Sequence, residues 1–119
     1  MGESPAAAMV ERLVHLLEAD GDLPRRYTLL EIEADEDLAI EPLFTLAEAQ
    51  WREQLNATRA AGDAWLAAGG SPLARVPSAV VPRTWNYLLN PLHADAARVR
   101  ILSHVEETFD ARLFQSRLR

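Results

Sequence analysis

The chain has 119 residues, 49% hydrophobic and 25% charged, which is typical of a soluble domain long enough to bury one core. Its net charge of −6 argues against binding nucleic acid, and the lack of cysteine excludes disulfides and thiol chemistry. No apolar run approaches the ~18 residues that span a bilayer, and no secretory signal is visible. We therefore expect a single cytoplasmic domain over residues 1–119, without contact to a membrane.

A helix is predicted at the start of the chain. Ser4 can cap the first free N–H groups, and Pro5 suits the first helical position because it has no N–H to lose. Residues 6–19 favour helix, which Asp20-Gly21 ends. Glu11 borders the apolar stripe, and a carboxylate at such a border is usually just solvated. The stripe consists of residues at helical spacing: Met9, Val10, Leu13, Val14, Leu16 and Leu17.

A strand and a second helix are predicted next. Residues 27–33 alternate weakly between apolar and acidic side chains, as a half-exposed strand does. An acidic loop and a short extended piece with a turn follow up to Phe44. Residues 46–55 favour helix. A clearer helix, capped by Asn56 or Thr58, runs to Ala68 and is stopped by Gly69-Gly70. Gly62 inside it predicts close packing there.

The stretch from Leu73 to Pro91 contains the most distinctive residues of the chain. Leu73–Val76 reads as a buried strand that Pro77 ends, which leaves Ser78 just beyond the strand's carboxyl end. Ligands are commonly held at that end of a strand in α/β folds. No periodicity fits residues 77–91, so we expect irregular backbone packed over the core. It is either a structural clamp or one wall of a site.

The remaining elements complete an α+β prediction. Residues 93–97 predict a turn or short helix, residues 99–102 a strand, residues 108–109 a last short strand, and Leu113-Phe114 an apolar anchor. The fold class is therefore α+β, with two main helices on a small mixed or antiparallel sheet. That sheet is expected to contain Tyr27–Glu33, Leu73–Val76 and Val99–Leu102.

Pattern alone assigns no chemistry to these residues. Ser78 has no recognisable base and no glycine-flanked turn, so a local turn hydrogen bond is its simplest role. His15, His93 and His104 lack the spacing of metal ligands, and no metal is expected. The sequence contains neither GxGxxG nor GxxxxGK[ST], so neither a Rossmann nor a P-loop nucleotide site is predicted.

Several segments together resemble one protein family. They are VPSAVVPRTWNYLLNP (76–91), HADAARVRI (93–101), FDARLF (109–114), SPAAAMVERLVHL (4–16), YTLLEIEADEDLAIE (27–41) and ATRAAGDAWLAAG (57–69). Together they resemble RES-domain proteins, bacterial toxins that destroy NAD and are named for an arginine, a glutamate and a serine. The resemblance implies a partial ADP-ribosyltransferase-like core.

The resemblance also implies site residues and partners. Glu11 falls on the family's glutamate and would stabilise positive charge on the ribose as the nicotinamide–ribose bond breaks. Ser78 falls on the family's serine and would bind the nicotinamide-ribose part of NAD. Apart from the resemblance, Asn86 and Asn90 are interpreted as structural amides that tie irregular backbone together, with a contact to NAD as the alternative. Phosphate or water would accept the ribose, and an Xre-like antitoxin would neutralise the toxin.

One departure from the family pattern leaves the enzyme question open. The N-terminal segment that carries the family's arginine is absent, so we expect an N-terminally truncated domain that binds NAD weakly and turns it over poorly or not at all. Arg75 and Arg83 are nearest to Ser78 but match no family motif. Missing strands would also leave a bare sheet edge, with a tendency to form a homo-oligomer. The alternative function is a non-catalytic relative that only binds a protein partner.

Overall fold

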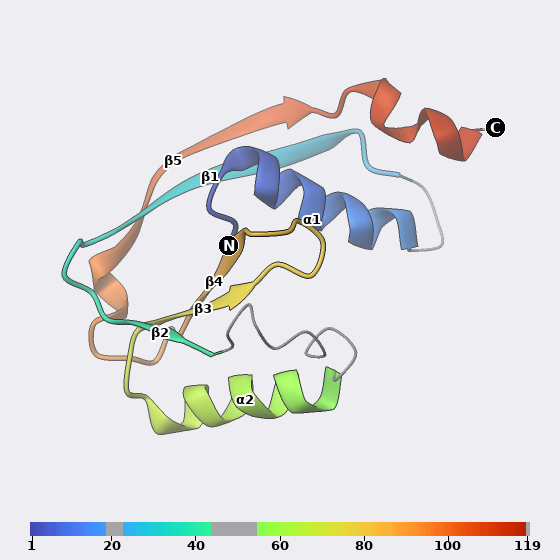
Figure 1. The fold of residues 1–119 in the computed structure, drawn as a ribbon. Helices are drawn as coiled ribbons and strands as arrows, with labels where there is room; N and C mark the ends of the chain where they lie inside the picture. The colour runs from blue at the N-terminus through green and yellow to red at the C-terminus, as the bar shows by residue number, and fades with distance from the viewer. Residues whose placement is uncertain (19–22, 44–54, 119) are drawn as a thin grey trace.

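The structure is a computed structural model that describes residues 1–18, 23–43 and 55–118. It has an α+β fold in which α1 lies on one side of a three-stranded sheet and α2 on the other, while a long two-stranded sheet crosses above α1 (Figure 1). None of the helices in the described ranges is long and apolar enough to cross a membrane. The elements are α1 (Pro5–Glu18), β1 (Arg26–Ala34), β2 (Ile40–Pro42), α2 (Leu55–Ala68), β3 (Leu73–Pro77), β4 (Trp85–Leu89), the 3₁₀ helix η2 (Ala96–Arg98), β5 (Val99–Thr108) and the 3₁₀ helix η3 (Ala111–Leu118).

The fold class and both main helices are confirmed, but the predicted single sheet is wrong. The three predicted strands all form, and they divide between two sheets. β1 pairs antiparallel with β5, whereas β3 lies between β2, which is parallel to it, and β4, which is antiparallel. The irregular backbone predicted around Trp85–Leu89 is also wrong, because this segment is β4. The short extended piece before Phe44 is confirmed as β2.

The start of α1 follows its sequence signals. The Ser4 hydroxyl accepts a hydrogen bond from the N–H of Ala7 at 3.1 Å, and Pro5 is the first helical residue. The helix runs to Glu18, and the predicted stop at Asp20-Gly21 lies outside the described residues. The apolar stripe is half-buried for most of its length, although Leu17 at its end is exposed.

α2 is held to the sheet by Trp65, which is 5% exposed. Its indole N–H donates to the Ser71 hydroxyl at 2.9 Å, and that hydroxyl donates to the carbonyl of Leu73 at 3.0 Å. The predicted helix end is confirmed, since Gly69 adopts φ 63°, a conformation suited to glycine. The predicted close packing at Gly62 is wrong, because an added Cβ would meet no atom within 4 Å.

The predicted caps of α2 are also wrong, because Asn56 and Thr58 both lie inside the helix. The helix predicted over residues 46–55 falls almost wholly outside the described part of the chain. The terminal apolar anchor is confirmed at Phe114, which is buried and stacks edge-on against Phe109 with ring centroids 5.5 Å apart.

The two-stranded sheet leaves much apolar surface in solvent. Leu30 is 46% exposed and Ile101 61% exposed, although the alternation of β1 had suggested an apolar face turned to the core. In the part of the chain that the structure describes, the outer edges of β1 and β5 pair with no further strand. Unpaired edges are sites of association between chains. Self-association through such an edge therefore stays a prediction.

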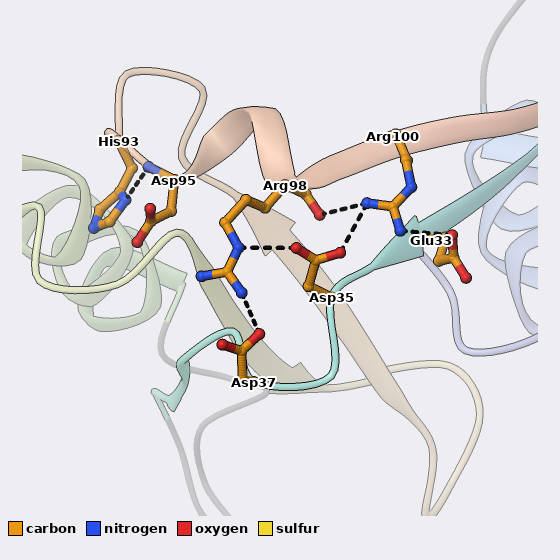
Figure 2. A network of polar contacts seen from close by, with 7 residues as sticks. All are labelled: Glu33, Asp35, Asp37, His93, Asp95, Arg98 and Arg100. Carbon is orange, nitrogen blue, oxygen red and sulfur yellow. Dashed lines mark hydrogen bonds and ion pairs between the residues drawn. The ribbon is translucent and has the colours of Figure 1, made fainter.

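A network of ion pairs joins the end of β1 to the start of β5 (Figure 2). Asp35 accepts hydrogen bonds from Arg98 Nε at 2.9 Å and from Arg100 Nη1 at 2.8 Å. Arg100 also pairs with Glu33 at 2.8 Å, and Arg98 with Asp37. The network fixes the point where the chain leaves the two-stranded sheet for β2.

We expect Asp35→Asn to lower the thermal midpoint at pH 7, with the difference from the parent protein shrinking below about pH 4. Hydrogen bonds from Arg98, then Arg100, lower the pKa of Asp35. A depressed pKa in the folded state stabilises the fold above the unfolded pKa, and this stabilisation is lost as pH falls through the folded pKa. Melting curves at pH 7 and pH 3 measure the effect.

The matched control is Asp110→Asn. Asp110 is also an aspartate whose pKa an arginine lowers, but its partner Arg112 is only two residues away, so the pair joins no distant elements. We expect little change in its midpoint. An Asp35→Asn deficit that persists undiminished at pH 3 would contradict the prediction.

Candidate functional site

Ser78 lies where β3 ends, and its side chain is almost fully buried at 2% exposure. Its N–H donates to the carbonyl of Thr84 at 2.8 Å, so the two strands stay paired beyond Pro77. Its hydroxyl oxygen accepts hydrogen bonds from the N–H groups of Val80 at 3.2 Å and Val81 at 2.9 Å. The predicted local turn bond is therefore present, and it ties down the loop between β3 and β4.

Glu11 is hydrogen-bonded to Ser78, which lies 67 positions further along the sequence. Glu11 lies half-buried on α1, and its Oε1 accepts hydrogen bonds from the Ser78 hydroxyl and from the Asn86 amide nitrogen, the latter at 2.9 Å. Within the described ranges, no hydrogen bond or ion pair reaches the second carboxylate oxygen, Oε2. Glu11 and Ser78, which the family resemblance singled out, thus form one cluster with Asn86, called here the Glu11 cluster.

Strand geometry explains why Asn86 belongs to this cluster. In the β3–β4 ladder Asn86 lies opposite Val76, and the added pair of Ser78 with Thr84 continues the ladder two residues on. Side chains two apart on a strand share a face. Ser78 and Asn86 therefore share the face of the sheet that α1 covers.

The first residues of the chain pair with β4 and pack against the start of α1. Gly2 forms an antiparallel bridge with Asn86, and Met1 and Tyr87 exchange backbone hydrogen bonds at 2.7 and 2.8 Å. A Cβ on Gly2 would come within 2.7 Å of the Ala8 nitrogen, so only glycine fits this close approach. Burial lowers the pKa of the Met1 amino group, while the charge of Glu11 acts in the opposite direction.

Neither nearby arginine joins the Glu11 cluster. Arg75 precedes Val76 by one residue and Ser78 by three, so its side chain lies on the opposite face of β3. There its guanidinium carbon is 4.6 Å from the ring centroid of Trp85. Its Nε is buried without a hydrogen-bond partner. Arg83 is exposed in the β3–β4 loop with a positive φ of 61°, an uncommon conformation for arginine.

The contact between Asn86 and Glu11 was not predicted from the sequence. The sequence did contain a signal for it. If residues 85–89 form a strand antiparallel to β3, the side chains of Asn86 and Ser78 point to the same face of the sheet. The run Trp85-Asn86-Tyr87-Leu88-Leu89 masked this reading because apolar residues fall on both of its faces.

Among the described residues, no group of three or more metal-ligating side chains is present.

Comparison with known proteins places the chain in a family. A model of the RES domain matches residues 1–110. The chain is 40% identical to the protein named Toxin Res of Pseudomonas putida, over 93% of this chain and 75% of that protein. It is 32% identical to the Prs ADP-ribosylating toxin of a Sphingobium species, over 94% of this chain and 71% of that protein. The chain belongs to the RES domain family.

Proposed function

We propose that the protein is a toxin that degrades NAD by cleaving the bond between nicotinamide and ribose. The observation that carries the proposal is the Glu11 cluster, in which a half-buried carboxylate is held by two donors on one oxygen and keeps the other oxygen free of described partners. Two relatives are named toxins, and the name of one states that it ADP-ribosylates, a reaction that draws ADP-ribose from NAD.

The chemistry needs a negative charge at this place. When the bond between ribose C1′ and the nicotinamide nitrogen breaks, its electron pair leaves with nicotinamide and the ribose becomes cationic. The Glu11 carboxylate would stabilise that cation. An oxygen of phosphate or water then bonds to C1′, and water gives up a proton in doing so. A preorganised charge aimed at the developing cation is worth more than the same charge in water.

Further parts of the proposal rest on the composition, on the unpaired sheet edges and on the family resemblance. Residues 1–119 act as one cytoplasmic domain, a cognate Xre-like antitoxin neutralises the toxin, and two copies associate. We also expect NAD to bind weakly. The described arginines make no contact to the Glu11 cluster, and charge-assisted hydrogen bonds are the strong ones for phosphate.

The lack of a described arginine at the Glu11 cluster favours a second candidate, a non-catalytic relative that binds only a protein partner. A substrate with two phosphates needs cationic partners, and neither Arg75 nor Arg83 contacts Glu11, Ser78 or Asn86. A binding module needs no such partner, and the exposed apolar side chains of β1 and β5 would suit one.

Incubation of purified protein with NAD, with and without phosphate, separates these functions when nicotinamide release is followed by chromatography. We expect slow release, and calorimetric titration should give weak NAD affinity. Faster release with phosphate would identify phosphorolysis, whereas equal rates would identify hydrolysis. A folded protein that releases no nicotinamide in either buffer would contradict cleavage and favour the binding module.

A further inference from the structure

Asn86 reaches the Glu11 cluster from a strand that is paired on both sides. It is the second residue of β4, with β3 hydrogen-bonded on one side and the Gly2 bridge on the other. Its Nδ2 donates to Glu11 Oε1 at 2.9 Å, and the Ser78 hydroxyl donates to the same oxygen. The amide is half-buried, so little water competes for this hydrogen bond.

Two donors on one oxygen have a geometric consequence. A glutamate side chain has three rotatable bonds, and its carboxylate can present either oxygen unless something fixes it. Donors from two different points, just beyond the end of β3 and near the start of β4, hold Oε1 and thereby fix the plane of the carboxylate. Oε2 then has one orientation, and in the described part of the chain no donor competes for it.

We infer that Asn86 is a positioning residue, which acts through Glu11 by fixing the carboxylate so that Oε2 faces the ribose cation. This role rests on the proposed NAD cleavage and differs from the expected direct contact between Asn86 and NAD. An amide suits the role because its NH₂ group is a donor at every pH, whereas a carboxylate at the same place would repel Glu11.

The first test is Asn86→Asp, which keeps the shape of the side chain and replaces the donor by an acceptor. We expect kcat for nicotinamide release to fall on the order of 10- to 100-fold, because displacement of a reacting group by about 1 Å has that effect. KM for NAD should change less than about threefold, since Asn86 does not touch NAD in this proposal. A direct contact would instead raise KM.

The matched control is Leu88→Asp. Leu88 lies two residues along β4 on the same face and is 36% exposed, so the substitution adds the same charge to the same face without removing a hydrogen bond to Glu11. We expect kcat for this variant to stay within about twofold of the parent value.

A second measurement separates positioning from a structural role. Combining Asn86→Asp with Glu11→Gln removes the repulsion between the two carboxylates of the Asn86→Asp variant, because glutamine carries no charge. We expect the double variant to be more stable to denaturant than the sum of the single changes predicts, yet inactive.

The outcomes distinguish the two proposals. No nicotinamide release from the parent protein would overturn NAD cleavage and the role of Asn86 with it. Release by the parent together with an unchanged kcat in Asn86→Asp, or with additive stabilities in the double variant, would overturn the role of Asn86 alone.

Discussion

Replacing Glu11 by glutamine is expected to lower kcat for nicotinamide release by on the order of a hundredfold or more, with the Kd for NAD changed less than about threefold. The substitution keeps the shape of the side chain and an oxygen that can accept from Ser78 and Asn86. It removes the negative charge, which matters most when the ribose becomes cationic. Nicotinamide release measures kcat, and calorimetric titration with NAD measures Kd.

The control for this variant is Glu3→Gln. Glu3 is an exposed carboxylate at the other end of the contact between the N-terminal residues and β4, where its Oε1 accepts from the Trp85 N–H at 3.4 Å. Glutamine preserves that acceptor, so we expect unchanged turnover. If Glu11→Gln weakens NAD binding as much as it slows turnover, Glu11 positions the substrate and does not stabilise the transition state.

Elements with local signals could be predicted from the sequence. The helix start at Ser4-Pro5 depends only on neighbouring residues, and so does the end of α2 at Gly69. β3 was predicted because a short apolar run between two prolines has few alternatives. In each case the residues that determine the structure lie within a few positions of it.

The partition into two sheets could not be predicted, because strand pairing is a long-range property. β1 pairs with β5 across more than sixty positions, and its apolar residues Leu30 and Ile32 remain exposed. Periodicity therefore indicated a strand without indicating what its apolar face contacts. β4 was missed for a related reason, since apolar residues fall on both of its faces and give no alternation.

The candidate site was predicted in part, and by resemblance more than by pattern. Pattern alone read Glu11 as a solvated carboxylate and Ser78 as a turn residue, and the turn bonds of Ser78 are indeed present. The resemblance singled out both residues, and the structure brings them into contact. The contact with Asn86 could not be foreseen while β4 was read as irregular, because only a strand defines which way Asn86 faces.

Replacing Trp65 by alanine is expected to destabilise the fold by about 3–5 kcal/mol, a large part of the 5–15 kcal/mol typical of a domain. Trp65 joins α2 to the three-stranded sheet: its ring is buried, and its N–H donates to the buried Ser71 hydroxyl at 2.9 Å. Alanine leaves a cavity and removes the donor, whereas Trp65→Phe keeps most of the ring and should cost less. Leu66→Ala, at the exposed neighbouring position, is the control and should change stability by less than about 1 kcal/mol. Urea unfolding followed by circular dichroism measures all three variants. A loss for Trp65→Ala no larger than that for Leu66→Ala would show that α2 does not depend on this contact.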